Sequence, residues 1–175
     1  MVVSGIKLKK AIFFDRDGTL NVDTGYVHNW ENFVWIPGAR EAIKLANKMD
    51  YLVFVVTNQS GIGRGYYTEQ VVNKLHNRMN SDLAGLNARI DGFEFCPHHP
   101  EEARLEYKIA CDCRKPAPGM ILKLLEKRQI DPKKSLMIGD HDTDVAAAKA
   151  ANVEGHLFVR GNLHDFLKPL LQRPA

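Results

Sequence analysis

The sequence predicts an α/β domain in which helices cover both faces of a doubly wound, mostly parallel sheet. Five short apolar segments, bounded by polar residues or glycine, are typical of buried strands: residues 11–14, 52–56, 93–95, 136–138 and 156–159. Segments with helical periodicity lie between them. This alternation of strand and helix favours a parallel sheet with both faces covered.

Two of the intervening segments have a clear helical face. After Thr68, a candidate N-cap, apolar residues recur at spacings of three and four: Val72, Leu75, Met79, Leu83 and Leu86. A second helix, after Pro118 and Gly119, is expected to bury Ile121, Leu122 and Leu125. Residues 15–37 form a long connection, and such a loop in a compact domain is usually functional. From Gly161 onward we expect a short helix and then fraying chain.

The composition limits the class of protein. With 175 residues and 45% hydrophobic content, the chain can bury one sizeable core, so we expect a single domain over residues 1–175. The net charge of +3 is modest and the basic residues are spread out, which argues against a nucleic-acid or membrane surface. The apolar runs are too short to span a membrane, and MVVSGIKLKK lacks the order of a signal peptide. We therefore expect a cytoplasmic protein.

Polar clusters follow four of the predicted strands directly. They are DRDGT from Asp15, TNQSG from Thr57, CPHH from Cys96 and GDHDTD from Gly139. The carboxyl ends of parallel strands meet at one edge of such a sheet, and ligands bind beyond that edge. The sequence therefore predicts one site to which all four clusters contribute.

Asp15 and Asp17 follow the first strand, and the strand period of two predicts that their carboxylates point the same way. Two like charges this close repel each other unless a cation lies between them. Mg²⁺ takes oxygen ligands and keeps positions open for a phosphate. We therefore expect Asp15, Asp17 and Asp140 to bind Mg²⁺.

The same carboxylates are suited to the hydrolysis of a phosphate monoester. One can attack phosphorus to form an aspartyl phosphate, while the other protonates the leaving alkoxide and later activates water. We assign Asp15 as the nucleophile and Asp17 as the general acid and base. Taken alone, D-x-D-G-T has another interpretation, an acidic turn in which Gly18 supplies a positive φ.

Four motifs in order favour the catalytic interpretation. The chain resembles the haloacid dehalogenase superfamily in its set of motifs: DRDGT, Thr57 in VVTN, Lys115 after a loop, and GDHDTD. The resemblance implies a Rossmann-like domain in which Thr57 binds phosphate and Lys115 neutralises charge. The segment GIGRG at residues 61–65 does not satisfy the G-x-G-x-x-G pattern of a dinucleotide site. We interpret it as a mobile loop beside the phosphate site, with Arg64 either contacting substrate or solvated.

All three cysteines lie in one short window with two adjacent histidines. Three thiolates and one imidazole form a closed, tetrahedral zinc site. Cys96, Cys111 and Cys113 supply three ligands. His98 is favoured as the fourth, because its C-x-H spacing mirrors the later C-x-C spacing, and His99 is the alternative. Cysteines can also pack as small apolar residues, but this stretch is polar and has no core periodicity.

Three motifs carry a closer resemblance: CPHHP followed by CDCRKPAPGM, together with NVDTGYVH at residues 21–28. In these motifs the chain closely resembles the D-glycero-D-manno-heptose 1,7-bisphosphate 7-phosphatases, in the histidinol-phosphate phosphatase-like branch. The likeness covers residues 11–160. It implies a capless, monomeric protein with a zinc-binding loop at residues 96–113. It also implies substrate contacts from Asp23, Thr24, Gly25, Tyr26, Thr57, Asn58, Gln59, Ser60, Arg114 and Lys115. The family usually has lysine where this chain has His141, a further candidate contact, so affinity or its pH dependence is expected to differ.

The favoured hypothesis is a Mg²⁺-dependent phosphatase that removes the 7-phosphate of D-glycero-D-manno-heptose 1,7-bisphosphate. Such an enzyme acts in ADP- or GDP-heptose synthesis for lipopolysaccharide core or a related glycan, and its partner is a small phosphorylated sugar, with no nucleic acid and no membrane. The alternative with the same chemistry is a histidinol-phosphate phosphatase of histidine biosynthesis. The alternative of another class is a catalytically silent, zinc-stabilised binding module, against which the intact site residues argue: Asp15, Asp17, Thr57, Lys115 and Asp140.

Overall fold

The computed structural model describes residues 8–173. Its sheet has five strands, all parallel, in the order β3-β2-β1-β4-β5. The strands are β1 (Lys10–Phe14), β2 (Tyr51–Asn58), β3 (Gly92–Cys96), β4 (Leu136–Gly139) and β5 (Glu154–Leu157). The predicted fold class is confirmed. Residues 1–7, which belong to the segment interpreted as lacking a signal peptide, and residues 174–175, at the end of the predicted fraying tail, lie outside the described residues.

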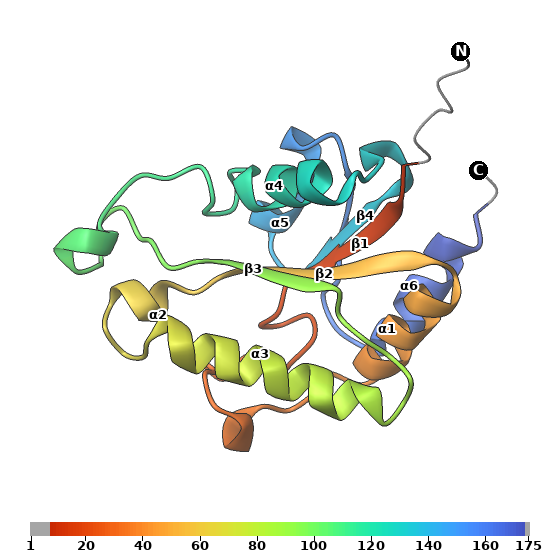
Figure 1. The fold of residues 1–175 in the computed structure, drawn as a ribbon, viewed down its shortest axis with the longest axis horizontal. Coiled ribbons are helices and arrows are strands. Elements are labelled where there is room, and N and C mark those ends of the chain that lie inside the picture. Colours follow the sequence, from red (N-terminus) through yellow and green to blue (C-terminus); the bar gives the residue numbers. More distant parts are fainter. Residues whose placement is uncertain (1–7, 174–175) are drawn as a thin grey trace, which may run out of the picture.

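Helices cover both faces of this sheet (Figure 1). The helices are α1 (Ala39–Lys48), α2 (Ser60–Gly63), α3 (Glu69–Ala84), α4 (Gly119–Arg128), α5 (Asp142–Ala150) and α6 (Leu163–Leu171). Three short 3-10 turns complete the elements: η1 (Trp30–Asn32), η2 (Leu105–Tyr107) and η3 (Pro132–Lys134). Within the described residues, no helix is long and apolar enough to cross a membrane.

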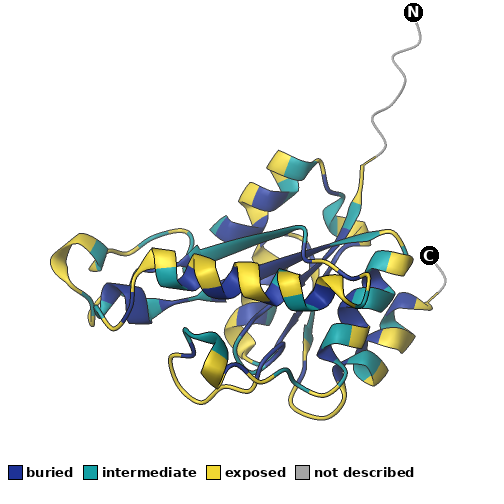
Figure 2. Cartoon of the chain, turned by 60° about the horizontal axis from the view of Figure 1, so that its bottom comes forward, coloured by how far each residue is buried: buried dark blue, intermediate teal, exposed yellow. Residues whose placement is uncertain are grey.

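The central strand β1 divides the core into two parts. Ile12 and Phe14 pack with residues of α1, α3 and α6, whereas Ala11 and Phe13 pack with residues of α4 and α5. All four side chains are fully buried. Because successive residues of a strand point to opposite faces, a strand covered on both sides is apolar throughout. In Figure 2 the covering helices are accordingly buried toward the sheet and exposed on their outer sides.

The strand order reverses beside β1. Phe14 is in register with Val55 of β2 on one side and with Ile138 of β4 on the other. In a doubly wound sheet, a crevice for ligands opens beyond the carboxyl ends of the strands at this reversal. Asp15 lies there, and its backbone N–H donates to the carbonyl of Ile138 at 2.9 Å.

The predicted helix after Thr68 is confirmed as α3, and the threonine hydroxyl oxygen accepts from the N–H of Val71 at 3.4 Å. Leu86 lies beyond the end of this helix and is only half-buried. In α4 the predicted face is partly wrong, because Leu122 is 45% exposed. Ile121 is buried as predicted and Leu125 is half-buried against the same core, whereas Met120 and Leu124 take the place given to Leu122.

The last strand begins two residues earlier than predicted. Its register is set by its single partner β4, with Glu154 opposite Leu136. Phe158 follows the strand and is buried, with its N–H donating to the carbonyl of Gly139 at 2.7 Å. Val159 is 74% exposed, so it does not belong to the buried strand as predicted.

The glycine-rich segment at residues 61–65 also differs from the prediction of a mobile loop. Ser60–Gly63 form one helical turn, α2. Arg64 forms an ion pair with Glu102, on the connection between β3 and α4. Its guanidinium is thus held by a carboxylate outside the crevice.

Candidate active site

A cavity of about 370 Å³ opens at the carboxyl ends of β1, β2 and β4. It is lined by Asp15, Asp17, Asp23, Gly25, Tyr26, Thr57, Asn58, Gln59, Ser60, Tyr67, Lys115, His141, Thr143 and Asp144. Three of the four predicted clusters therefore meet as expected. The fourth, CPHH, supplies none of the lining side chains among the described residues.

Lys115 is the buried cation of this cavity. Its Nζ lies 2.8 Å from Oδ1 of Asp15 and 2.5 Å from Oδ1 of Asp144. Burial by itself lowers the pKa of a lysine, but the two neighbouring carboxylates outweigh burial and raise the pKa of Lys115 above its ordinary value. The ammonium therefore stays charged beside Asp15.

Asn58, the last residue of β2, holds the backbone of Lys115 in place. Its Nδ2 donates to the carbonyl of Lys115 at 3.1 Å, and its Oδ1 accepts from the N–H of Lys115 at 3.0 Å. Asn58 lines the cavity as predicted, and these two bonds give it a positioning contact that the sequence did not predict.

Three carboxylates cluster beside Lys115, and two of them, Asp15 and Asp144, contact it. Oxygens of Asp15, Asp140 and Asp144 all lie within 4.8 Å of one another. Burial raises the pKa of Asp15 to about 7, with Lys115 opposing the shift and Asp144 adding to it. Burial also raises the pKa of Asp140. One ammonium does not balance three carboxylates, so this donor set fits a small divalent cation that prefers oxygen, such as Mg²⁺.

Gly18, in the turn after β1, allows this cluster to form. Its φ is +84°, the positive value that the alternative interpretation of the motif as an acidic turn also includes. A Cβ at this position would overlap the carboxylate of Asp140. Glycine is therefore required both for the backbone conformation and for the close approach of Asp140.

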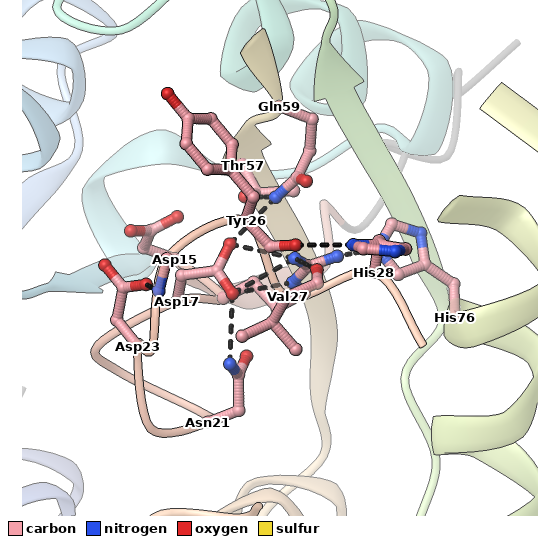
Figure 3. Close-up of polar contacts among 12 residues, drawn as sticks. Asp15, Asp17, Asn21, Asp23, Tyr26, Val27, His28, Thr57, Gln59 and His76 are labelled. Carbon is pink, nitrogen blue, oxygen red and sulfur yellow. Dashed lines mark hydrogen bonds and ion pairs between the residues drawn. The ribbon is translucent and has the colours of Figure 1, made fainter. Parts of the chain in front are cut away.

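Asp17 lies outside this group of three carboxylates. Its Oδ1 accepts from Nδ2 of Asn21 at 3.0 Å, and its Oδ2 accepts from Nε2 of Gln59 at 2.9 Å (Figure 3). The guanidinium of Arg16 donates to both oxygens. The chain turns after β1, so Asp15 and Asp17 face different partners, and the cation that balances Asp17 here is an arginine. A Mg²⁺ contact from Asp17 stays a prediction.

Thr57 and Gln59 form a buried polar chain with Tyr67. Nε2 of Gln59 also donates to Oγ1 of Thr57 at 2.9 Å, and the hydroxyl of Tyr67 donates to Oε1 of Gln59 at 2.8 Å. Burial raises the pKa of Tyr67 to about 12, so its hydroxyl keeps its proton and remains a donor. The sequence did not predict Tyr67, which lies in no motif and reaches the cavity only through the fold.

Residues 23–26 form an exposed turn at the edge of the cavity. Oδ1 of Asp23 accepts from the N–H of Gly25 at 2.9 Å, and the ring of Tyr26 packs edge-on against Tyr66 with centroids 4.9 Å apart. Asp23, Gly25 and Tyr26 line the cavity as expected. Thr24 is exposed and is not among the lining residues.

Two predicted substrate contacts remain, His141 and Arg114, and only the first lies at the cavity. His141 lines the cavity, and its Nε2 lies 3.4 Å from Oδ2 of Asp140. Its N–H donates to Oδ2 of Asp144 at 3.0 Å, so Asp144 caps α5 while it contacts Lys115. Arg114 is not among the lining residues, and its Nη1 instead donates to the carbonyl of His98 at 3.3 Å.

The connection between β3 and α4 extends from the body of the fold and returns to it (Figure 1). This return brings Sγ of Cys113 to 2.9 Å from Sγ of Cys96 and 3.2 Å from Sγ of Cys111. Nδ1 of His98 lies 3.3 Å from Sγ of Cys113. All four ligand atoms lie within 4.8 Å of one another. This set of three sulfurs and one imidazole is compatible with tetrahedral zinc.

His99 makes different contacts. Its Nδ1 accepts from the backbone N–H groups of Glu101 and Glu102, at 3.2 and 2.9 Å. Its Nδ1 is thus engaged in the following turn. Of the two histidines that the sequence left open, the structure brings His98 to the cysteines.

Comparison with known proteins gives consistent results. Residues 112–166 match the family described as HAD-hydrolase-like. The D-glycero-beta-D-manno-heptose-1,7-bisphosphate 7-phosphatase of Haemophilus influenzae is 46% identical over 153 residues, which cover 87% of this chain and 83% of that protein. The protein of the same name from Escherichia coli K12 is 47% identical over 150 residues, covering 86% and 78%.

A solved structure is also similar. The D,D-heptose 1.7-bisphosphate phosphatase from B. bronchiseptica, complexed with magnesium and phosphate, matches with a TM-score of 0.76 and 31% identity, covering 91% of this chain and 86% of that one. The parallel sheet, the buried Asp15–Lys115 pair and these similarities define the chain as a phosphatase of the haloacid dehalogenase superfamily. Within that superfamily, it belongs to the family of the D-glycero-D-manno-heptose 1,7-bisphosphate 7-phosphatases.

Proposed function

We propose that this phosphatase removes the 7-phosphate of D-glycero-D-manno-heptose 1,7-bisphosphate, in the synthesis of a nucleotide-activated heptose for lipopolysaccharide core or a related glycan. The observation that carries the proposal is the position of Asp15, which follows β1 at the strand-order reversal and pairs with the buried Lys115 at 2.8 Å. The names of the relatives supply the substrate.

In the first step, a carboxylate oxygen of Asp15 attacks phosphorus and the bond from phosphorus to the sugar oxygen breaks. Asp17, in its protonated form, gives its proton to the departing oxygen, so that heptose 1-phosphate leaves as an alcohol. Lys115 offsets the negative charge that otherwise repels the nucleophile, and the Thr57 hydroxyl donates to a phosphate oxygen.

In the second step, Asp17 is a carboxylate and takes a proton from water. The water oxygen attacks phosphorus, and the bond between phosphorus and Asp15 breaks. Inorganic phosphate leaves, and both aspartates return to their starting states. Every atom and proton is accounted for by substrate, water and these two side chains.

Asp15, Asp140 and Asp144 are the residues that would hold Mg²⁺, because their carboxylate oxygens lie within 4.8 Å of one another and Lys115 contacts only two of them. When bound there, the ion would add positive charge beside the phosphoryl group. Cys96, His98, Cys111 and Cys113 would hold zinc, whose role is to close the loop at residues 96–113. Arg114 follows Cys113 directly, so a closed loop would also fix the backbone that carries Arg114, whose contact with the sugar stays a prediction.

Steady-state kinetics on a panel of heptose, fructose and histidinol phosphates tests the substrate. A preference for the heptose bisphosphate is expected, whereas a preference for histidinol phosphate would overturn the substrate and leave the chemistry intact. Replacing Asp15 by Asn tests the chemistry, since wild-type turnover in that variant is incompatible with an aspartyl phosphate. A cytoplasmic location and a monomeric state stay predictions, and sedimentation or light scattering measures the latter.

A further inference from the structure

Arg16, between the two aspartates of DRDGT, is the largest fully buried side chain among the described residues, at 0% exposure. The two chemical steps above use its neighbours and leave Arg16 itself without a role. A buried guanidinium is costly unless its charge is paired and its N–H groups are bonded. The partners of Arg16 therefore indicate what it is for.

The first partner is Asp17. Nη2 of Arg16 lies 3.0 Å from Oδ1 and 2.9 Å from Oδ2 of Asp17, and Nε lies 3.3 Å from Oδ1. With Asn21 and Gln59 on its other sides, the carboxylate of Asp17 meets N–H donors at both oxygens (Figure 3). Its side chain is 20% exposed, toward the cavity that it lines.

The second partner is the connection that carries the substrate turn. Nη2 of Arg16 donates to the carbonyl of Val27, at 2.5 Å. Val27 is 2% exposed and directly follows Tyr26, which lines the cavity. One guanidinium thus bonds both the Asp17 carboxylate and the backbone carbonyl of Val27, the residue that directly follows the turn at residues 23–26.

The third partner, His76 of α3, supports the arginine from behind. Nη1 of Arg16 lies 3.4 Å from Nε2 of His76, whose ring stacks on Phe93 with centroids 4.3 Å apart. Burial lowers the pKa of His76 to about 3, with the charge of Arg16 adding to the shift, so the ring is neutral and can accept this bond. Arginine suits these three partners because its donors lie in a rigid plane, whereas lysine has one nitrogen.

We propose that Arg16 is a positioning residue that holds the Asp17 carboxylate and the substrate turn at residues 23–26 in one arrangement, supported by His76. This inference rests on the proposed role of Asp17 as general acid. It predicts that loss of the guanidinium impairs proton delivery to the leaving group and loosens the turn together.

The test is the dependence of kcat/KM on the leaving group across substituted phenyl phosphates. This constant reports the steps up to release of the phenol, and basic phenols need protonation more than acidic ones. In Arg16→Lys we expect kcat/KM for phenyl phosphate to fall about 100-fold but that for p-nitrophenyl phosphate to fall less than about tenfold, since general acid catalysis is worth 10²–10⁴-fold. Equal losses for all esters, or none, would overturn the proposal.

The turn is followed by hydrogen exchange in the same variant. Amides of residues 22–28 should exchange faster than in the wild type, and unchanged exchange contradicts the proposed link to the turn. Arg89→Lys is the matched control, because Arg89 also bonds a nearby aspartate, Asp91 at 2.9 Å, but is 66% exposed. It should leave both the leaving-group dependence and the exchange unchanged.

Should Arg16→Lys fail to fold, His76→Phe replaces it, since phenylalanine keeps the stack on Phe93 and removes the acceptor. In His76→Phe the dependence of kcat/KM on the leaving group should then be steeper than in the wild type, though less so than expected for Arg16→Lys. In His76→Gln, which keeps an acceptor, it should be near wild type. An unchanged dependence in His76→Phe overturns the proposal. Asp17→Asn distinguishes a failure of the general-acid role of Asp17 from a failure of the positioning role of Arg16. If its dependence equals the wild-type one, Asp17 is not the general acid and the proposed mechanism fails; if Asp17→Asn steepens and Arg16→Lys does not, the role of Arg16 alone fails.

Discussion

The ammonium nitrogen of Lys115 lies 2.8 Å from Oδ1 of Asp15, and the two side chains are only 3% and 10% exposed. A lysine and an aspartate this deeply buried are held together by strong mutual attraction, because little water screens their charges. The same lysine contacts Asp144 at 2.5 Å. One cation therefore stabilises the ionised form of the nucleophile and fixes an acidic neighbour on α5.

Replacing Lys115 by Met is expected to lower kcat/KM for any phosphate monoester by about 100-fold or more, since a preorganised charge at the reacting group is lost. Lys123→Met is the matched control, because Lys123 pairs with Glu94 at 2.8 Å but is 60% exposed. It should have wild-type kinetics. Equal activity of the two variants would contradict the role given to Lys115.

Replacing Asp144 by Asn is expected to weaken Mg²⁺ activation by about 10–100-fold, the usual cost of losing a ligand or its supporting partner. Asparagine can still accept the N–H of His141, so the start of α5 is preserved. Titration of activity with Mg²⁺ measures the effect. Asp142→Asn, an exposed change in the same helical turn, is the control, and an unchanged Mg²⁺ requirement in Asp144→Asn argues against a metal role for this residue.

The two adjacent histidines predict different outcomes. His98→Ala removes the imidazole 3.3 Å from Cys113 and should lower both the zinc content and the midpoint of thermal unfolding, because structural zinc contributes to folding. His99→Ala removes only an acceptor for two backbone N–H groups and should retain zinc. Metal analysis of the purified variants decides which of the two histidines binds zinc. Loss of zinc from His99→Ala alone would reverse the assignment.

His76 predicts a pH dependence of stability. Its pKa is about 3 in the folded protein and near 6.5 when exposed, so the unfolded chain binds more protons between these values and stability falls as the pH falls below 6.5. Between pH 7 and 5 this group should cost about 2 kcal/mol of unfolding free energy. Urea unfolding of wild type and His76→Phe at both pH values measures the difference. Parallel pH dependences in the two proteins would contradict it.

The features that could be predicted from the sequence depend on residues that lie close together along the chain. An apolar strand followed at once by Asp15 needs only the strand itself to reach the crevice, and Cys111 and Cys113 lie together because they are two residues apart. These parts depend little on where distant segments pack.

What the sequence did not predict depends on contacts between distant segments. Arg16 reaches His76, 60 residues away, and Asp144 reaches Lys115, 29 residues away. The contact of the buried Arg16 with both oxygens of Asp17 was also not predicted from the sequence. The exposed side of α4 at Leu122 was likewise set by how the helix sits on the sheet.

The central claim is that Asp15 carries the phosphoryl group between the two steps. Asp17→Asn should slow the hydrolysis of this intermediate more than its formation from p-nitrophenyl phosphate, whose leaving group needs little protonation. The intermediate should therefore accumulate when the variant reacts with that ester and is quenched in acid. Mass spectrometry of the digested protein is predicted to find one added phosphoryl group on the peptide that contains Asp15. Release of phosphate without such a species, or phosphate attached to any other residue, would contradict the account.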